Sequence, residues 1–421
     1  MAFKRADILL PKFADNSEKM NKWSVVACDQ YTSEPEYWDE VKKITDGAFS
    51  TLNLTVPEIY LNDADIDERI KNTNSAMDKY TESGVFQELK NSYIFVERTL
   101  RNGVKRLGIV GMVDLEEYDY TIGSKTKVRA TEGTVVSRIP PRLKVRKDAP
   151  IELPHIMLLI DDEACDIIEP NEKITDTFEK VYDFDLMQNS GHLTGYKMSD
   201  TASEELDRKL SALSDLESFN KKYGVCEKSP LVYAMGDGNH SLATAKTYYE
   251  NLKKEIGDKA KKTPARYALC ELVNLHDKSL VFEAIHRVIF DADGDEFLKA
   301  LEKEYSVSYD ENAVGQSFLF VYEGKQKKVT VTNPTEYLTV ATVQKALDEF
   351  CAQNGGEIDY IHGEDVVLNL SKGKNFGIIL DAMDKKDLYK SVILDGALPR
   401  KTFSMGDACD KRFYTEARKI K

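Results

Sequence analysis

The sequence has few cysteines, and none of them belongs to a recognisable pair. Six cysteines are spread over 421 residues with no C-x-x-C motif and no compact framework of the secreted kind. We therefore expect reduced thiols that act as small, partly buried apolar residues rather than as catalysts. They are Cys28, Cys165, Cys226, Cys270, Cys351 and Cys409.

Long hydrophobic runs are also missing. The N-terminal segment offers only the apolar run at residues 8–10, which is too short for a signal peptide. No later segment approaches the length of a membrane span. The sequence thus predicts a cytoplasmic protein without a membrane partner.

Basic side chains are outnumbered by acidic ones. The chain carries 58 Lys and Arg against 72 Asp and Glu, and its formal net charge is −14. This charge repels a phosphate backbone over most of the surface, and no helix-turn-helix segment is evident. Nucleic acid is therefore not expected as a partner. A small anionic ligand remains compatible with the charge, because Arg and Lys can converge inside a cleft.

No low-complexity linker and no internal repeat divides the chain. Its length nevertheless exceeds that of one ordinary compact core, and 42% hydrophobic with 31% charged residues is a globular composition. We predict an N-terminal domain at residues 1–290 and a smaller α+β domain at residues 291–421. The sequence leaves open whether the chain forms a homo-oligomer.

Short apolar runs predict the strands of an α/β fold. The runs at residues 92–97 and 107–113 flank the sequence Asn102-Gly103, which is typical of a hairpin turn. Residues 23–28 predict a buried strand that delivers polar side chains at its end, beginning with Asp29. Further strands are predicted at residues 156–160, 231–235, 318–322, 328–331 and 376–380.

Helical periodicity is clearest after residue 241. Apolar residues recur there at spacings of three and four, which places them on one face of a helix. This stripe consists of Leu242, Ala245, Tyr249, Leu252 and Ile256. Hydroxyl residues and Pro35 predict another helix start near residue 36, and helices are expected at residues 297–305 and 343–350.

A glycine-rich turn joins a predicted strand to the helix after residue 241. Residues 236–241 spell G-D-G-N-H-S, and such a turn brings unpaired backbone N–H groups and the positive end of a helix dipole to one point. Gly236 and Gly238 permit positive φ and the close approach of a ligand. Asn239 or His240 can cap the helix or bond phosphate oxygens. The turn suits a phosphate-like anion, and the alternative is a tight connection without a ligand.

Asp237 is the exception in this turn. A carboxylate beside a phosphate needs a metal ion, a proton or a sugar hydroxyl as its partner. No pair of histidines has the spacing of a zinc site, so the residues that would bind a metal stay open.

Several segments resemble, in the same order along the chain, the motifs of one protein family. Residues 129–134 and Arg142-Leu143 are similar to its H-E-x-T segment with the downstream Arg-Leu, residues 235–246 to its D-G-H-H-R turn, residues 282–287 to its P-x-H-R segment and residues 398–403 to its M-P-x-K-S-T segment. The chain thus resembles a widespread bacterial family of unknown function in the superfamily of ParB, sulfiredoxin and the free serine kinases.

The resemblance implies a ParB/sulfiredoxin-like mixed-sheet N-terminal domain that binds a nucleotide through the turn. ATP or ADP with Mg²⁺ is the implied cofactor. The implied binding residues are Arg129, Glu132, Thr134, Arg142, Gly236, Asp237, Gly238, Asn239, His240, Ser241, His286, Arg287 and Lys401.

The chain departs from the family motif within the turn. Asn239 replaces the first His, and Ser241 replaces the Arg that usually closes the turn, so one direct phosphate contact is lost. The cations that can take its place are Arg129, Arg142, Arg287 and Lys401.

Some of the implied residues also have purely structural explanations. His286 follows an apolar stretch and can be a core histidine bonded to a backbone carbonyl. Arg287 can pair with Glu132 or Asp237. Glu132 can equally serve as the ion-pair partner that orients Arg129.

The free serine kinases of the same superfamily imply phosphoryl transfer to a small hydroxyl compound such as a free amino acid. Such an enzyme needs a phosphate cradle, cations for the developing charge and a carboxylate for the hydroxyl. Asp29 or Glu34 can supply the carboxylate, with Asp29 favoured because Glu34 also suits a helix start. His240 is a further catalytic candidate. The alternative is a non-catalytic nucleotide or metabolite sensor that acts through a protein partner.

Overall fold

The computed structural model describes residues Met1–Lys421, which form two compact units. Unit 1 consists of Met1–Ala130, Thr134–Leu280 and Gly406–Lys421. Unit 2 consists of Thr131–Gly133 and Val281–Met405. Relative to the domains predicted from the sequence, residues 281–290 lie in unit 2, and the last residues of the chain return to unit 1.

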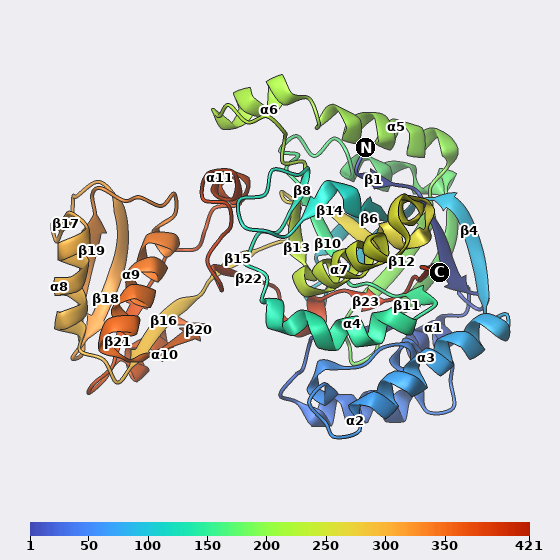
Figure 1. The fold of residues 1–421 in the computed structure, drawn as a ribbon, viewed down its shortest axis with the longest axis horizontal. Helices are drawn as coiled ribbons and strands as arrows, with labels where there is room; N and C mark the ends of the chain where they lie inside the picture. The colour runs from blue at the N-terminus through green and yellow to red at the C-terminus, as the bar shows by residue number, and fades with distance from the viewer. The chain divides into compact units, whose positions relative to one another are not determined.

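A large mixed sheet organises unit 1 (Figure 1). Its strands are β1 (Phe3–Lys4), β5 (Ile94–Thr99), β6 (Lys105–Asp114), β7 (Tyr118–Asp119), β8 (Val128–Arg129), β10 (Met157–Ile160), β11 (Glu179–Asp185), β12 (His192–Lys197), β13 (Tyr233–Asp237) and β14 (Tyr267–Asn274). They follow the order β11-β12-β5-β6-β14-β10-β13-β8-β7, with β1 paired to β6. The pairs β10–β14, β13–β8 and β7–β8 are parallel, and the others are antiparallel. The predicted α/β class is confirmed.

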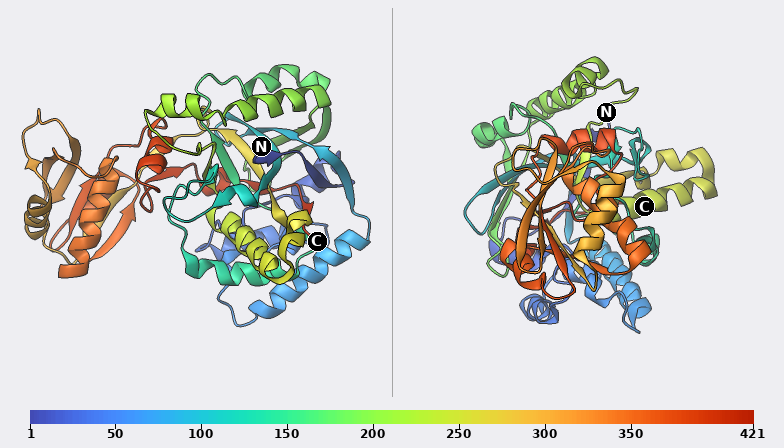
Figure 2. Two further views of the ribbon diagram at one scale, coloured as in Figure 1. Left: turned by 45° about the horizontal axis from the view of Figure 1, so that its top comes forward. Right: turned by 90° about the vertical axis from the view of Figure 1, so that its left-hand side faces the viewer.

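Helices cover both sides of this sheet. Those of unit 1 are α1 (Ser17–Trp23), α2 (Pro35–Thr45), α3 (Ile66–Glu82), α4 (Ile139–Asp148), α5 (Asp200–Ala212), α6 (Leu216–Tyr223) and α7 (Asn239–Ile256). In Figures 1 and 2, α5 and α6 lie on the opposite side of the sheet from α3 and α4. None of the helices combines the length and the apolar character that a membrane crossing demands.

The hairpin and the long helix predicted from the sequence are both present. Strands β5 and β6 pair antiparallel around a turn in which Gly103 has a φ of 82°. Helix α7 begins at Asn239, close to the expected start. Of the predicted stripe, Leu242 and Tyr249 are fully buried, whereas Ile256 at the end of the helix is 40% exposed. The stripe therefore packs against the sheet except in its last turn.

The strand predicted at residues 23–28 is mostly wrong. Trp23 is the last residue of α1, and only Val25–Val26 is extended, as β3. The helix begins because the Asn16 side chain accepts a hydrogen bond from the Lys19 amide, a local cap that outweighs the apolar run. Strand β3 pairs with β23 (Phe413–Tyr414), which belongs to the returning C-terminal segment.

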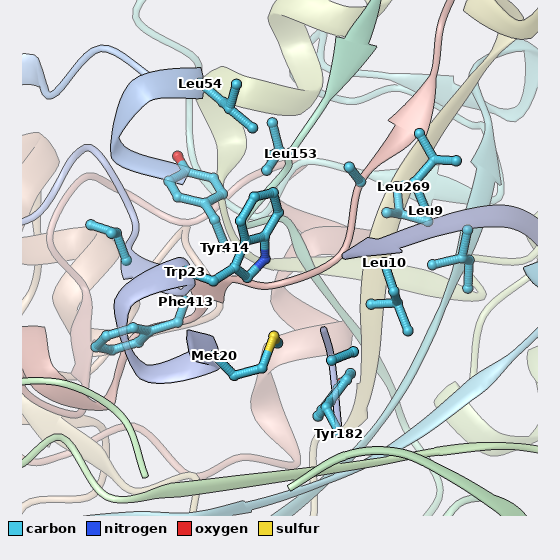
Figure 3. Close-up of a cluster of buried hydrophobic side chains, with 14 of the residues drawn as sticks. Leu9, Leu10, Met20, Trp23, Leu54, Leu153, Tyr182, Leu269, Phe413 and Tyr414 are labelled. Atoms are coloured by element: carbon cyan, nitrogen blue, oxygen red, sulfur yellow. The ribbon is translucent and has the colours of Figure 1, made fainter. Parts of the chain in front are cut away.

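The C-terminal segment Gly406–Lys421 is tied into the core of unit 1. Trp23 is fully buried in a cluster with Leu10 and Met20 (Figure 3), and its Nε1–H donates to the Thr415 carbonyl at 2.9 Å. A second strand of this segment, β24 (Arg418–Lys419), pairs with β9 (Ile151–Glu152). The last residues of the chain therefore form part of the structure of unit 1.

Buried ionic contacts also hold the C-terminal segment. The Arg412 guanidinium donates from Nε to Glu271 at 2.7 Å and from Nη2 to Glu416 at 2.8 Å. The hydroxyl of Tyr182 donates to the other oxygen of Glu416 at 2.5 Å. These side chains are almost fully buried, so each charge depends on its partner.

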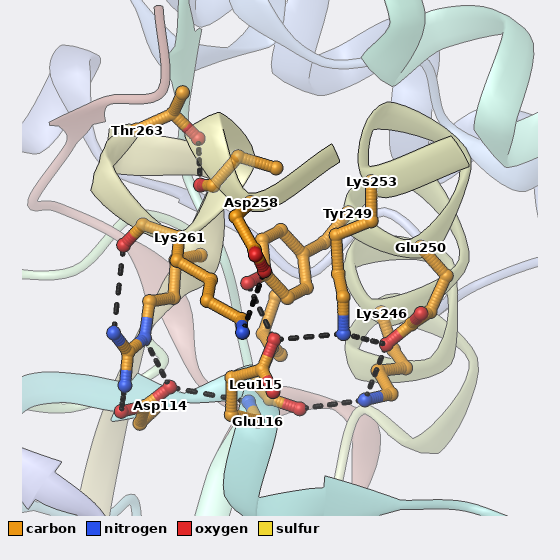
Figure 4. Close-up of polar contacts among 12 residues, drawn as sticks. Asp114, Leu115, Glu116, Lys246, Tyr249, Glu250, Lys253, Asp258, Lys261 and Thr263 are labelled. Carbon is orange, nitrogen blue, oxygen red and sulfur yellow. Dashed lines mark hydrogen bonds and ion pairs between the residues drawn. The ribbon is translucent and has the colours of Figure 1, made fainter. Parts of the chain in front are cut away.

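Polar contacts along one side fix helix α7 to the loop after β6 (Figure 4). Lys253 lies 2.9 Å from a Glu116 oxygen, and the Tyr249 hydroxyl donates to the same carboxylate at 2.5 Å. Lys246 donates to the Leu115 carbonyl at 2.8 Å and pairs with Glu250 at 2.9 Å. Packing and ion pairs together hold the helix whose first turn follows the glycine-rich segment.

Unit 2 is an α+β structure with its own core. Its main sheet has the order β17-β19-β18-β21-β16-β20, and β15 pairs with β22. The elements are β15 (Phe282–Ala284), β16 (His286–Phe290), α8 (Gly294–Glu304), β17 (Val307–Ser308), β18 (Gln316–Tyr322), β19 (Lys325–Val331), α9 (Thr339–Asn354), β20 (Glu357–Ile361), α10 (Glu364–Leu370), β21 (Phe376–Ile379), α11 (Asp387–Leu394) and β22 (Phe403–Met405). The strands and helices predicted between residues 297 and 380 are confirmed.

Candidate functional site

Only one of the two glycines in the glycine-rich turn has the positive φ that the sequence allows at both. Gly238 adopts a φ of 79°, and a Cβ there would lie 3.0 Å from Ile156 Cα. Gly236 does not have positive φ, because it is still part of β13. A Cβ at Gly236 would lie 2.9 Å from the Leu159 side chain, so tight packing explains this glycine. Both positions bring the backbone close to β10.

The first turn of α7 keeps its amides available. No side chain caps the helix, so the predicted capping by Asn239 or His240 is wrong. The first amide bonded within the helix is that of Leu242, which donates to the Gly238 carbonyl at 3.0 Å. The Asn239 Oδ1 and His240 Nε2 atoms are buried without a hydrogen-bond partner. Unpaired donors and a positive dipole end meet at this point.

Asp237 has a cationic partner that the sequence did not reveal. Its Oδ1 accepts from the Gly238 amide at 2.8 Å, and its Oδ2 lies 3.2 Å from Nζ of Lys411. Lys411 arrives on the C-terminal segment, far away in the sequence. The carboxylate is therefore accounted for by a lysine within the site.

A buried histidine joins the candidate acid Asp29 to the turn. His155 is 4% exposed, and its Nε2 lies 3.3 Å from Asp29 Oδ2 and 3.4 Å from Ser241 Oγ. Its Nδ1 shares a hydrogen bond with the Tyr414 hydroxyl at 2.8 Å. In a hydrolytic Ser-His-Asp triad the acid and the serine contact opposite ring nitrogens, whereas here both approach Nε2. His155 is therefore not arranged to activate Ser241 as a nucleophile.

The charges of this cluster follow from its contacts. Burial opposes ionisation of both partners, but the ion pair prevails: His155 lowers the pKa of Asp29, and Asp29 raises the pKa of His155. Burial, with Arg142 and Arg138 adding to it, lowers the pKa of His240 to about 4. The contacts thus favour the charged form of His155, whereas His240 is neutral at neutral pH.

The pair of Asp29 and His155 predicts a stability profile with pH. The lowered pKa of Asp29 adds stability above its ordinary value of 3.8, and the raised pKa of His155 adds stability below its ordinary value of 6.5. The free energy of unfolding lost in His155→Gln should therefore be largest between these values, about 1–3 kcal/mol. It should shrink as pH rises through the raised pKa of His155.

Urea denaturation at a series of pH values measures this difference. His192→Gln is the matched control, because His192 also contacts two carboxylates at 2.7 Å but its side chain is 37% exposed. Equal pH profiles for the two variants would contradict a stabilising buried pair.

Arg142 is the implied arginine that belongs to this cluster. It lies on α4, pairs with Glu58 and donates to the Arg138 carbonyl at 2.6 Å. Its charge lowers the pKa of His240 and opposes the raised pKa of His155. Four cationic side chains thus surround the turn, Arg138, Arg142, His155 and Lys411, and the last three pair with Glu58, Asp29 and Asp237 respectively.

Arg129 and Thr134 are placed differently within unit 1. Arg129 is 2% exposed and donates to the carbonyls of Thr126 at 2.8 Å and Ser229 at 3.1 Å, which leaves it bracing two loops. The Thr134 hydroxyl is buried without a partner. The cations at the turn are therefore those of α4 and of the C-terminal segment, because the Arg129 guanidinium is bonded to these two carbonyls instead.

The remaining implied residues belong to unit 2. Arg287 is fully buried and donates to Gln344 Oε1 and to the Lys401 carbonyl, both at 3.1 Å. Burial lowers the pKa of Arg287 to about 10. His286 Nδ1 accepts from the Leu380 amide at 3.2 Å, so the expected bond to a carbonyl is wrong. Glu132 forms a parallel bridge with Leu398.

Glu34, the other candidate acid, is exposed and makes no side-chain cap at the start of α2. The structure brings Asp29 rather than Glu34 to His155. A weak signal for His155 was present, since it stands just before a predicted strand, whereas Asp29 drew attention because it follows one. Nothing local in the sequence marks Lys411 or Tyr414.

A cavity of about 140 Å³ opens beside the first turns of α7. Among its polar lining residues, His155 contacts both Ser241 and Tyr414, and we call these three, with Thr244 on the same helix as Ser241, the polar end of the cavity. Further polar residues of the lining are Thr55, Glu58, Arg142, Arg146 and Glu152. Cys28 also lines it, and burial raises the pKa of this thiol to about 12. The apolar lining consists of Leu54, Val56, Leu61, Met77, Val145, Ala149, Ile151, Leu153 and Ile156.

Groups that resemble metal ligands lie elsewhere. Asp161, Glu163 and His276 lie close together, but the Lys222 ammonium lies 2.9 Å from Asp161 and takes the place that a metal ion would have beside this carboxylate. A second group contains Asp407, Cys409 and Asp410. Neither group includes a residue of the turn.

Comparison with known proteins gives one family and a low-identity likeness to solved structures. The family model described as "Protein of unknown function (DUF1015)" matches residues 10–350. No curated protein matches the chain. A free serine kinase mutant in complex with AMP is 14% identical over 73% of this chain and 91% of its own, with a TM-score of 0.40. A conserved hypothetical protein from Pyrococcus furiosus is 14% identical over 72% of this chain and 92% of its own, with a TM-score of 0.36.

Proposed function

The chain belongs to the DUF1015 family, and we propose that it binds a nucleotide at residues 236–241 and transfers a phosphoryl group to a small hydroxyl compound. The uncapped first turn of α7, with cations around it, carries this proposal. Helix amides without partners bind phosphate oxygens, and the αL backbone of Gly238 lets a ligand approach closely. Arg142 and Lys411 have more N–H donors than their contacts with Glu58 and Asp237 use, and the remaining donors would bond the phosphates.

The motifs found in the sequence favour a nucleotide over free phosphate. Segments around residues 129, 236, 282 and 398 resemble those of the ParB, sulfiredoxin and free serine kinase superfamily, and we include membership of that superfamily in the proposal. The Oδ1 atom of Asn239 is a hard oxygen ligand of the kind that Mg²⁺ prefers, and it is buried without another partner. Magnesium bound there with the nucleotide would neutralise phosphate charge.

The transfer step assigns roles to Asp29 and His155. The hydroxyl oxygen forms a bond to the terminal phosphorus, the bond from that phosphorus to the bridging oxygen breaks, and the shortened nucleotide leaves. Asp29 orients the hydroxyl and accepts its proton, while His155, whose charged form Asp29 favours, stabilises the phosphoryl oxygens. A carboxylate with a lowered pKa suffices, because loose phosphoryl transfer depends more on positioning than on a strong base.

Titration calorimetry with ADP, ATP and CTP in the presence of Mg²⁺ tests the binding. Arg142→Met should weaken ADP binding by about tenfold or more, the worth of a charge-assisted hydrogen bond. Lys144→Met is the matched control on the same helix, because its side chain is 64% exposed. No detectable binding of any nucleotide to the wild-type chain would end the proposal.

A nucleotide sensor without catalysis is the second candidate. Ser241 stands where the family motif has an arginine, so the turn supplies one cation fewer for a transition state. Phosphorus NMR of ATP with added hydroxyl compounds separates the two. Binding without any new phosphate ester would favour the sensor.

A further inference from the structure

The cavity beside α7 has a largely apolar lining, which suits an apolar ligand better than a hydrophilic acceptor. Leu54, Met77, Ala149 and Leu153 line it and are all buried. We propose that this cavity holds the body of the phosphoryl acceptor, and that the acceptor is a neutral alcohol with an aliphatic or aromatic body. The assignment as acceptor rests on the proposed function.

The lining favours a ligand without net charge. Its two arginines are each already paired: Arg142 with Glu58, and Arg146 with Glu152 at 2.6 Å. The charges of these two pairs cancel, as do those of His155 and Asp29, and burial of a further unpaired charge in this lining would be costly. A zwitterionic amino acid such as serine therefore suits the cavity poorly.

The size of the cavity sets the size of the ligand. A volume of about 140 Å³ is close to the roughly 150 Å³ apolar cavity that holds benzene in another protein. A single ring or a short branched chain fills such a space. Larger bodies would have to displace Met77 or the α4 side chains.

The polar end of the cavity orients the ligand. His155 Nε2 and Ser241 Oγ lie 3.4 Å apart at this end, and Asp29 contacts the same ring nitrogen of His155. An apolar body in the cavity turns its hydroxyl toward these groups, because the charged lining groups of Arg142 with Glu58 and Arg146 with Glu152 already bond each other. Ser241 is also in the first turn of α7, so the hydroxyl lies next to the proposed phosphate site.

Saturation-transfer NMR of the full chain with benzyl alcohol, and with glycerol as the hydrophilic comparison, tests the inference. Benzyl alcohol should receive saturation and glycerol should not. Ala149→Phe fills the cavity and should abolish the signal, and Val145→Trp does the same from a half-buried helix position if the first variant fails to fold. Ala212→Phe, on the exposed end of α5, should leave the signal unchanged.

Adding ADP with Mg²⁺ distinguishes the acceptor from the nucleotide base. Simultaneous binding of ADP and benzyl alcohol supports the inference, as does formation of benzyl phosphate from ATP. Displacement of benzyl alcohol by ADP would place the base in the cavity and overturn it. ADP binding without any benzyl alcohol binding would overturn the inference alone, whereas alcohol binding without ADP binding would remove the proposed function and the acceptor role with it.

Discussion

Replacing Gly238 with alanine should weaken ADP binding by at least about tenfold and destabilise the chain by about 1–3 kcal/mol. Gly238 has a φ of 79°, which costs any other residue conformational energy, and the added Cβ would lie 3.0 Å from Ile156 Cα. The turn must then shift against β10, and the amides of Asn239 and His240 move with it. Calorimetry with ADP and urea denaturation measure the two effects.

Gly224→Ala is the control that separates the effect of backbone strain from the effect of changing the proposed binding turn. Gly224 has a φ of 67° at the end of α6, and a Cβ there would meet no atom within 4 Å. This variant should lose stability through the same backbone strain while binding ADP like the wild type. If Gly238→Ala also binds ADP normally, the phosphates do not depend on the backbone of this turn.

The local parts of the site could be predicted from the sequence. The turn, the helix that follows it and the hairpin of β5 and β6 each depend on residues close together in the chain, where glycine and apolar spacing determine the backbone. The strand expected at residues 23–28 is mostly wrong, because helix α1, which begins at the Asn16 cap, continues to Trp23. Apolar composition alone did not distinguish the two structures.

The distant partners of the turn could not be predicted. His155 comes to it because β10 and β13 pair antiparallel, with Met157 opposite Asp237. Lys411 and Tyr414 come because the C-terminal segment returns to unit 1. Motif resemblance named Arg129 and Arg287, but it could not say that their guanidiniums bond carbonyls and Gln344. Such pairings arise from long-range packing, which short motifs do not encode.

The same C-terminal segment links the site to the stability of the core. Arg412→Met should lower the free energy of unfolding by about 3–5 kcal/mol, because it leaves Glu271 and Glu416 buried without their cation. Lys411 precedes this residue in the chain, so ADP binding should weaken as well. Urea denaturation and ADP titration of one preparation measure both.

Two comparisons identify the cause of the Arg412→Met effect. Arg208→Met breaks the ion pair with Glu205 on the exposed surface of α5 and should not measurably change stability. Adding Glu271→Gln and Glu416→Gln to Arg412→Met removes the stranded charges and should recover part of the lost stability. If ADP binding recovers together with stability, the buried network holds Lys411 and Tyr414 in position. If only stability recovers, Arg412 itself sets the backbone conformation that positions the preceding residue, Lys411.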